Sequence, residues 1–263
     1  AIDVTLNGSI NATVTVTGGD NDIIRNIENI VGSSGNDRIQ GDGNTNVLEG
    51  RDGDDRLVAS RGVDTLDGGV GSDTADYEVP SAASSIAVTL ADTGDSIVTV
   101  TGGDNDVLRN IENVIGTAGR DIVTGNALAN VLSGRGDNDT LNGGGGNDTL
   151  LGEAGSDLLL ASTGSDVFDG GIDVDTLDYS GLAGITGVSF TLAGAADATV
   201  TVSGGSNDIV RNVEDVVGTA FADDMTGDAE DNVLQGLGGA DRFGASGGAD
   251  TMDGGGSVDT VDY

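Results

Sequence analysis

A nine-residue repeat is the feature that most restricts how this chain can fold. Residues 116–178 divide into consecutive nine-residue units without remainder, and the clearest unit reads GGGGNDTLL (143–151). Position six of each unit carries an acid or its amide, and position eight carries an apolar residue. In a short strand one side chain points inward and its two neighbours point outward, while glycine permits a tight turn. The period therefore predicts turn–strand units, with positions one to six as the turn and seven to nine as the strand.

The unit recurs in three runs that cover residues 32–76, 116–178 and 218–262, each ending in Asp-Tyr. An acid or its amide keeps position six in every unit, which a chance glycine-rich sequence would not do. The position-six residues are Asp37, Asn46, Asp55, Asp64 and Asp73 in the first run, Asp121, Asn130, Asp139, Asp148, Asp157, Asp166 and Asp175 in the second, and Asp223, Asn232, Asp241, Asp250 and Asp259 in the third.

A longer motif leads into each run. GGDNDIIRNIENIVG (18–32) returns as GGDNDVLRNIENVIG (102–116) and as GGSNDIVRNVEDVVG (204–218). The copies are 84 and then 102 residues apart, so the second interval is longer by 18 residues, or two repeat units. The segments that precede them, 2–19, 86–103 and 188–205, alternate apolar and polar residues and predict pairs of β-strands. Within the motif, an arginine is followed three residues later by a glutamate, as in Arg211 and Glu214, and we expect a structural ion pair or a staple of the loop in place of ligand binding.

The charge of the chain limits the classes of function that it can serve. Its formal net charge is −35, all ten basic residues are arginine, and it contains no Lys, His, Cys or Trp. Such acidity argues against binding to nucleic acid and to anionic membrane surfaces, and no apolar run is long enough for membrane insertion. Without His, Cys or Lys the usual nucleophile and base pairs cannot be built, so we expect no enzymatic activity. The acidity favours a polyvalent cation as ligand.

The repeated units, with their glycines, position-six acids and position-eight apolar residues, resemble the RTX calcium-binding nonapeptide repeat. The resemblance implies an all-β parallel β-roll, or β-solenoid, in which each unit is half a turn. The 18-residue difference then adds one full turn and leaves every side chain on its own face. We expect three tandem modules joined by short linker strands: 1–84 (linker strands 2–31, repeats 32–77), 85–187 (linker strands 86–115, repeats 116–179) and 188–263 (linker strands 188–217, repeats 218–263).

The resemblance also implies where calcium binds. In the family each ion lies between unit n and unit n+2, held by two position-six side chains and by carbonyl oxygens of the loops. Carried over, this makes every position-six residue a metal ligand, in pairs such as Asp139 with Asp157, and gives up to about eleven calcium ions. Asn46, Asn130 and Asn232 depart from the family pattern because an amide oxygen carries no charge. The absence of His and Cys disfavours softer metals, and calcium tolerates irregular oxygen geometry better than magnesium does.

Two roles are compatible with such a roll. The first is a calcium-dependent structural or adhesive segment of a secreted bacterial protein, such as a surface layer, an adhesin or an extracellular filament. The resemblance implies type I secretion and folding on extracellular calcium, and neighbouring modules or subunits, arranged head to tail, would be its partners. The second is an accessory module of a secreted protease, lipase or alginate epimerase whose catalytic domain lies elsewhere.

The tyrosine that closes each run also has two interpretations. Tyr77, Tyr179 and Tyr263 could form a platform for stacking carbohydrate, or each could cover the open apolar end of its run. The second interpretation is favoured because a roll needs its apolar ends covered.

Overall fold

A computed structural model describes residues 1–78 and 85–263 as two compact units, Ala1–Asn126 and Ala127–Tyr263. The predicted boundary after residue 84 lies outside the described residues. The division into three modules stays a prediction. Among the residues that the structure describes, no helix has the length and hydropathy of a membrane span.

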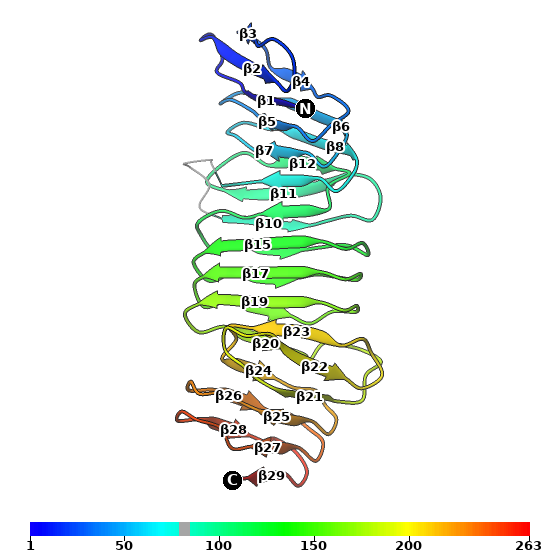
Figure 1. The fold of residues 1–263 in the computed structure, drawn as a ribbon, viewed down its shortest axis with the longest axis vertical. Coiled ribbons are helices and arrows are strands. Elements are labelled where there is room, and N and C mark those ends of the chain that lie inside the picture. Colours follow the sequence, from blue (N-terminus) through cyan, green and yellow to red (C-terminus); the bar gives the residue numbers. More distant parts are fainter. Residues whose placement is uncertain (79–84) are drawn as a thin grey trace. The chain divides into compact units, whose positions relative to one another are not determined.

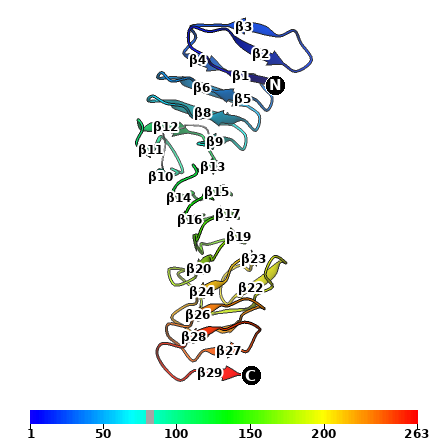
Figure 2. The same cartoon turned by 90° about the vertical axis from the view of Figure 1, so that its left-hand side faces the viewer.

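The first unit combines parallel strands that form half-turns of a roll with two antiparallel meanders (Figures 1 and 2). Its strands are β1 (Ile2–Thr5), β2 (Ala12–Val16), β3 (Asp22–Ile24), β4 (Asn29–Val31), β5 (Arg38–Gln40), β6 (Val47–Asp52), β7 (Arg56–Val58), β8 (Thr65–Val70), β9 (Thr74–Asp76), β10 (Ser85–Thr89), β11 (Ser96–Thr101), β12 (Asp106–Arg109), β13 (Asn113–Ile115) and β14 (Ile122–Thr124). Within this unit they form two sheets, in the orders β13-β9-β7-β5-β1-β2-β3 and β14-β10-β11-β12-β8-β6-β4.

The second unit repeats this arrangement. Its strands are β15 (Val131–Gly136), β16 (Thr140–Asn142), β17 (Thr149–Ala154), β18 (Leu158–Leu160), β19 (Val167–Ile172), β20 (Thr176–Asp178), β21 (Val188–Thr191), β22 (Ala198–Val202), β23 (Asp208–Arg211), β24 (Asp215–Val217), β25 (Asp224–Thr226), β26 (Val233–Gln235), β27 (Arg242–Gly244), β28 (Thr251–Asp253) and β29 (Thr260–Asp262). The two sheets have the orders β15-β17-β19-β23-β22-β21-β25-β27-β29 and β16-β18-β20-β24-β26-β28. In Figure 1 the parallel strands β15, β17 and β19 lie side by side.

The register confirms that each nonapeptide is half a turn. Strands of alternate units pair in parallel, 18 residues apart, as Leu150 does with Phe168 and Leu141 with Leu159. The position-eight side chains therefore stack inside the roll, and Leu141, Leu150 and Phe168 are all fully buried. Five strands are longer than predicted, because β6, β8, β15, β17 and β19 continue through the first three positions of the next unit.

The linker segments form the predicted strand pairs and add two further strands each. In the first unit, β10 pairs antiparallel with β11, and β11 with β12, as a meander inserted into one sheet. The strands β12 and β13 come from the motif at 102–116 and continue the parallel ladder of the preceding run, since β12 pairs with β8 and β13 with β9. The motif that looked like a linker is thus an integral part of the roll.

Candidate metal centres

The position-six side chains are tied together in columns through one of their two oxygens. The Asp157 Oδ1 atom accepts the backbone N–H of Asp139 at 2.8 Å, and the Asp175 Oδ1 atom accepts that of Asp157 at 2.8 Å. The same bond joins Asp37 to Asp55 and Asp223 to Asp241 at the same 18-residue spacing. Each acid therefore has its Oδ1 atom engaged, and its second oxygen is fixed in direction.

The second oxygen, Oδ2, points at the glycine that opens the turn. At Gly152 a Cβ atom would collide with Asp157 Oδ2 and with the carbonyl oxygen of Gly170. At Gly50 a Cβ atom would collide in the same way with Asp55 Oδ2 and the carbonyl oxygen of Gly68. Glycine at position one is required because a carboxylate oxygen and a carbonyl oxygen converge there. Both oxygens are hydrogen-bond acceptors, so a cation can satisfy them where a side chain cannot.

One class of turn leaves this buried Oδ2 atom without any hydrogen-bond partner, and we call these the open turns. Their position-two residues have a positive φ, for example 74° at Glu153 and 114° at Gly171. The acids concerned are Asp55, Asp73, Asp148, Asp157, Asp175 and Asp241. The turns of Asp139 and Asp259 share the positive φ at position two and the same approach of Oδ2 to the opening glycine. A buried acceptor without a partner costs about 1–3 kcal/mol, so a cation bound at these oxygens would stabilise the fold.

A second class closes on itself, and we call these the closed turns. Here position two is a serine or threonine whose hydroxyl or backbone N–H donates to the acid at position six. The Ser60 hydroxyl reaches Asp64 Oδ2 at 2.7 Å, and the Ser246 hydroxyl reaches Asp250 Oδ2 at 2.7 Å. The remaining acids closed in this way are Asp37, Asp121, Asp166 and Asp223. In these turns a hydroxyl or N–H hydrogen of the protein, with its partial positive charge, occupies the carboxylate oxygen that a cation would otherwise bind.

The asparagine positions are also satisfied by protein groups. Asn46 Oδ1 accepts the N–H of Asp42 at 2.8 Å, and its Nδ2 donates to the carbonyl of Glu28 at 2.8 Å. Asn232 repeats both bonds, with Asp228 at 2.9 Å and the Glu214 carbonyl at 3.0 Å. The backbone N–H of Asn130 donates to Asp148 Oδ1 at 2.9 Å. At Asn46 and Asn232 the amide group bridges an N–H and a carbonyl, which explains why these two units carry Asn in place of Asp.

Burial perturbs the acids of the open turns. Desolvation by burial is the largest cause, and it raises the pKa of Asp148 and Asp157 to about 6 and that of Asp175 to about 7. The backbone N–H that each carboxylate accepts works against this shift, and neighbouring carboxylates add to it. The closed acid Asp64 also has a raised pKa through burial, against which the Ser60 hydroxyl works. Without a cation, the open turns therefore oppose ionisation of their own carboxyl groups.

The fit of these turns to calcium rests on mixed ligands. Within the described parts of the chain, no three acidic side chains converge on one point. A cation at an open turn would therefore combine a carboxylate with backbone carbonyls, a donor set that calcium accepts. Asp121 and Asp139, which were predicted to share an ion, lie in the first and the second compact unit of the structure, and this pair stays a prediction.

The structure adds acids that the sequence prediction missed. Asp106 Oδ1 accepts the N–H of Asp64 at 2.8 Å, and Asp208 Oδ1 accepts that of Asp166 at 3.0 Å. Glutamates of the same motif extend the other column, as Glu214 does for Asp175. The signal was present in the sequence, because Asp106 and Asp208 stand at position six of a nine-residue stretch that ends with the buried strands β12 and β23.

The closing tyrosines are structural in the first two runs. Tyr77 and Tyr179 are buried, and the Tyr179 hydroxyl donates to Asp208 Oδ2 at 3.0 Å. The Tyr179 ring also meets Phe168 edge-on, with centroids 6.5 Å apart. Burial confirms the covering role for these two residues, whereas Tyr263 is fully exposed.

The arginine of the motif does not pair as predicted in the third copy. Arg211 forms ion pairs with Asp169 at 2.9 Å and Asp197 at 2.8 Å, while the Glu214 carboxylate accepts a backbone N–H. The ion pair between arginine and glutamate is therefore not formed in this copy, and each side chain instead binds a neighbouring segment, as the loop-staple alternative predicts. Arg109 likewise binds Asp95 at 2.7 Å.

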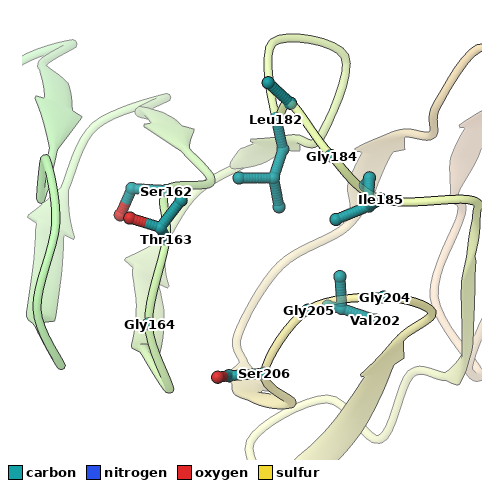
Figure 3. Close-up of a pocket in the computed structure, with 11 residues that line it drawn as sticks. Ser162, Thr163, Gly164, Leu182, Gly184, Ile185, Val202, Gly204, Gly205 and Ser206 are labelled. Atoms are coloured by element: carbon teal, nitrogen blue, oxygen red, sulfur yellow. The ribbon is translucent and has the colours of Figure 1, made fainter.

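A cavity of about 360 Å³ in the second unit lies between the turn that begins at Ala161 and the segment after Tyr179. Figure 3 shows Ser162 and Thr163 on one side and Leu182, Ile185 and Val202 on the other. The described residues that line it offer hydroxyl groups but no titratable side chain to activate them. It is therefore a hollow of mixed polar and apolar lining between turns, without a group that could act as an acid or a base.

Comparisons with known proteins address the repeats directly. No curated protein matches the chain. The crystal structure of the extracellular lipase LipA from Serratia marcescens is similar over 71% of this chain, at 20% sequence identity and a TM-score of 0.28, and the similarity covers 38% of the lipase chain. The profile of the RTX calcium-binding nonapeptide repeat (4 copies) matches residues 26–57, 41–75, 115–150, 151–181, 217–252 and 245–263. These matches cover more than half of the chain and include the open turns, and the chain belongs to the RTX calcium-binding nonapeptide repeat family.

Proposed function

We propose that the open turns are the calcium sites of this chain and that the roll is a calcium-dependent structural segment. The observation that carries the proposal is the buried, unpartnered Oδ2 atom that faces a carbonyl oxygen across the opening glycine, as at Asp157 and Gly170. The closed turns and the asparagine turns bind no ion, because their oxygens already accept protein hydrogens. The chain then binds fewer calcium ions than the about eleven that the repeat count allows.

In the second run, Asp139, Asp157 and Asp175 would hold successive ions along one sheet of the roll. Bound calcium supplies a positive charge that offsets the repulsion between stacked carboxylates. The residues of the chain orient the ligands: the position-six N–H groups fix Oδ1, and the positive φ at position two keeps local donors away from Oδ2.

The test is a calcium titration followed by far-UV circular dichroism. We expect a change from coil to β on adding about millimolar calcium, with magnesium substituting poorly. A complete β spectrum in excess EGTA at neutral pH would contradict the proposal. A second measurement is the number of calcium ions bound per chain at saturation, which should be lower than the about eleven that the repeats allow.

We further propose that the segment serves outside the cell, in a surface layer, an adhesin or an extracellular filament. Support comes from the family and from the expected contrast between low cytosolic and about millimolar extracellular calcium, the range of weak extracellular sites. The role of an accessory module in a secreted enzyme stays a prediction. Immunogold labelling of the native organism tests the location, and a signal confined to the cytoplasm would contradict it.

As partners we propose neighbouring modules or subunits of the same kind, joined head to tail. At both internal joints a motif covers the tyrosine of the preceding run, as Asp208 does for Tyr179. We propose that Tyr263 packs against a neighbouring module or subunit in the same way. Sedimentation of the calcium-loaded chain should show association that Tyr263→Ala weakens, while Tyr263→Ala with unchanged sedimentation would contradict the arrangement.

A further inference from the structure

The motif at 204–218 contains a turn that is three residues shorter than a normal repeat turn. Arg211 pairs with Asp169 and Asp215 pairs with Thr176, so the register is fixed on both sides. The three residues 212–214 therefore lie opposite the six residues 170–175. By this register Asn212 takes the place of the opening glycine, and Glu214 takes the place of the position-six aspartate.

The shortened turn presents oxygens to an open turn. The Glu214 Oε2 atom accepts the backbone N–H of Asp175 at 2.9 Å, as a position-six aspartate does elsewhere. A Cβ atom on Gly170 would collide with the Asn212 carbonyl oxygen, and it would also meet Asp175 Oδ2. The Asp175 side chain is fully buried, and its Oδ2 atom has no hydrogen-bond partner. These are the features of the open turns, except that the facing turn is formed by the motif residues Asn212 and Glu214 and not by a nonapeptide repeat.

The backbone of the shortened turn is held in place by its asparagine. Asn212 has a φ of 49°, a left-handed conformation that asparagine adopts more readily than most residues. Its Nδ2 atom donates to Asp169 Oδ1 at 2.7 Å. The carbonyl of Asn212 is thereby directed at Gly170. The additional methylene of glutamate relative to aspartate supplies the reach that the missing three residues remove.

The first unit contains the same arrangement. Glu112 Oε2 accepts the N–H of Asp73 at 2.9 Å, and the Asn110 carbonyl meets Gly68 beside Asp73 Oδ2. Asp73 is fully buried, and its Oδ2 atom also lacks a hydrogen-bond partner. Asn110 has a φ of 48°. Two joints with different neighbouring sequences thus build the same set of oxygens.

We propose that Glu214 completes the open turn of Asp175, and Glu112 that of Asp73, so that two of the sites for a divalent, oxygen-seeking cation lie at the joints between motif and run. The proposal rests on the proposed function, because these two sites are open turns. They differ from the other open turns in using a glutamate and an asparagine carbonyl from outside the nonapeptide runs. A solvent-open hollow lined by Asp173, Asn212, Glu214, Glu230 and Asp231 gives the cation an acidic approach to the second-unit site.

The test is the number of calcium ions bound per chain, measured by equilibrium dialysis at saturating calcium for wild type and for Glu214→Gln. Glutamine keeps an oxygen that accepts the Asp175 N–H but removes the charge. We expect Glu214→Gln to bind one ion fewer than wild type, and the double variant Glu112→Gln/Glu214→Gln to bind two fewer. The matched control is Glu28→Gln, because Glu28 has the same place in its motif but is exposed in the structure, and its ion count should equal that of wild type.

The outcomes separate this proposal from the proposed function. Calcium bound by wild type and by Glu214→Gln in equal number would overturn the role of the motif glutamates as ligands and leave the open turns as calcium sites. A wild-type chain that binds no calcium would overturn the proposed function itself. If Glu214→Gln does not fold in calcium, Glu112→Gln alone decides: one ion fewer supports the joint sites, and an unchanged count refutes them.

Discussion

Replacing Asp157 by asparagine should lower the number of calcium ions whose binding is coupled to folding. Asp157 Oδ1 accepts the N–H of Asp139, and the Asp157 N–H donates to Asp175 Oδ1, so this residue belongs to two successive sites of its column. Asparagine keeps the Oδ1 acceptor and the shape of the side chain. It replaces the unpartnered Oδ2 atom by an NH₂ group, which donates to the nearby carbonyl and repels a cation.

The expected magnitude follows from the number of sites that share the residue. Each saturated site raises the free energy of unfolding by about 1.4 kcal/mol for every tenfold increase in free calcium. Loss of both sites should therefore reduce that slope by about 3 kcal/mol per tenfold change in calcium. The control is Asp166→Asn, whose carboxylate is closed by the Ser162 hydroxyl at 3.0 Å. That variant should lose about 1 kcal/mol at every calcium concentration and keep the wild-type slope.

The assay is urea unfolding followed by far-UV circular dichroism at several free calcium concentrations from about 0.1 to 10 mM. Wild type, Asp157→Asn and Asp166→Asn are compared by the slope of the unfolding free energy against the logarithm of calcium concentration. Equal slopes for the two variants would refute the distinction between open and closed turns. A reduced slope for Asp166→Asn alone would show that the hydroxyl-closed turns are the ones that bind calcium.

Three further predictions concern pH, the opening glycine and the closing tyrosines. Burial raises the pKa of Asp175 from 3.8 to about 7 in the metal-free roll, so the stability that its protonated form contributes is present below about pH 4 and is lost as the pH rises through 7. Circular dichroism in EGTA should therefore show more β structure on acidification, and a signal independent of pH would contradict this. Gly152→Ala should raise the calcium concentration at the midpoint of folding, because the added Cβ fills the space beside the ligand oxygens. Ala161→Gly, in a closed turn, should leave that midpoint unchanged, and equal midpoints for the two variants would contradict a calcium site beside the opening glycine. Tyr179→Ala should cost about 3–5 kcal/mol in chemical unfolding and Tyr263→Ala less than about 0.5 kcal/mol, since the first is buried and the second is exposed; similar losses would show that Tyr179 covers nothing.

The period of the sequence was sufficient to predict the roll, because side-chain direction in a strand is set by position alone. Leu141 and Leu150 are buried where position eight requires it. The parallel pairing at 18 residues follows from the same period. The family comparison confirms the repeat that these positions define.

The division into open and closed turns could not be predicted from the period. It depends on the backbone conformation at position two. Arg51 and Leu237 adopt a positive φ there, of 89° and 65°, which would not be predicted for a residue other than glycine. A serine at the same place, such as Ser60, uses its own hydroxyl and makes the turn independent of a cation. The sequence shows the residue types, but the choice between these conformations depends on contacts with the neighbouring half-turns.

The acids of the motif were missed for a different reason. Glu214 replaces aspartate across a turn that is three residues shorter, so the nine-residue count is broken and the correspondence is visible only in the strand register. Asp208, by contrast, keeps the count and could have been found by extending the repeat backwards from the run.

The three kinds of turn answer one electrostatic requirement in different ways. At turns such as those of Asp55 and Asp157 a buried oxygen at position six faces a carbonyl oxygen, and an isolated pair of that kind is unfavourable. In the closed turns a hydroxyl such as that of Ser60 supplies the missing hydrogen, and at Asn232 the side-chain amide supplies it. In the open turns, such as that of Asp157, no donor of the protein is within reach. Calcium dependence is therefore confined to particular turns of the roll, and exchanging one residue type at position two or six should transfer a turn from one class to the other.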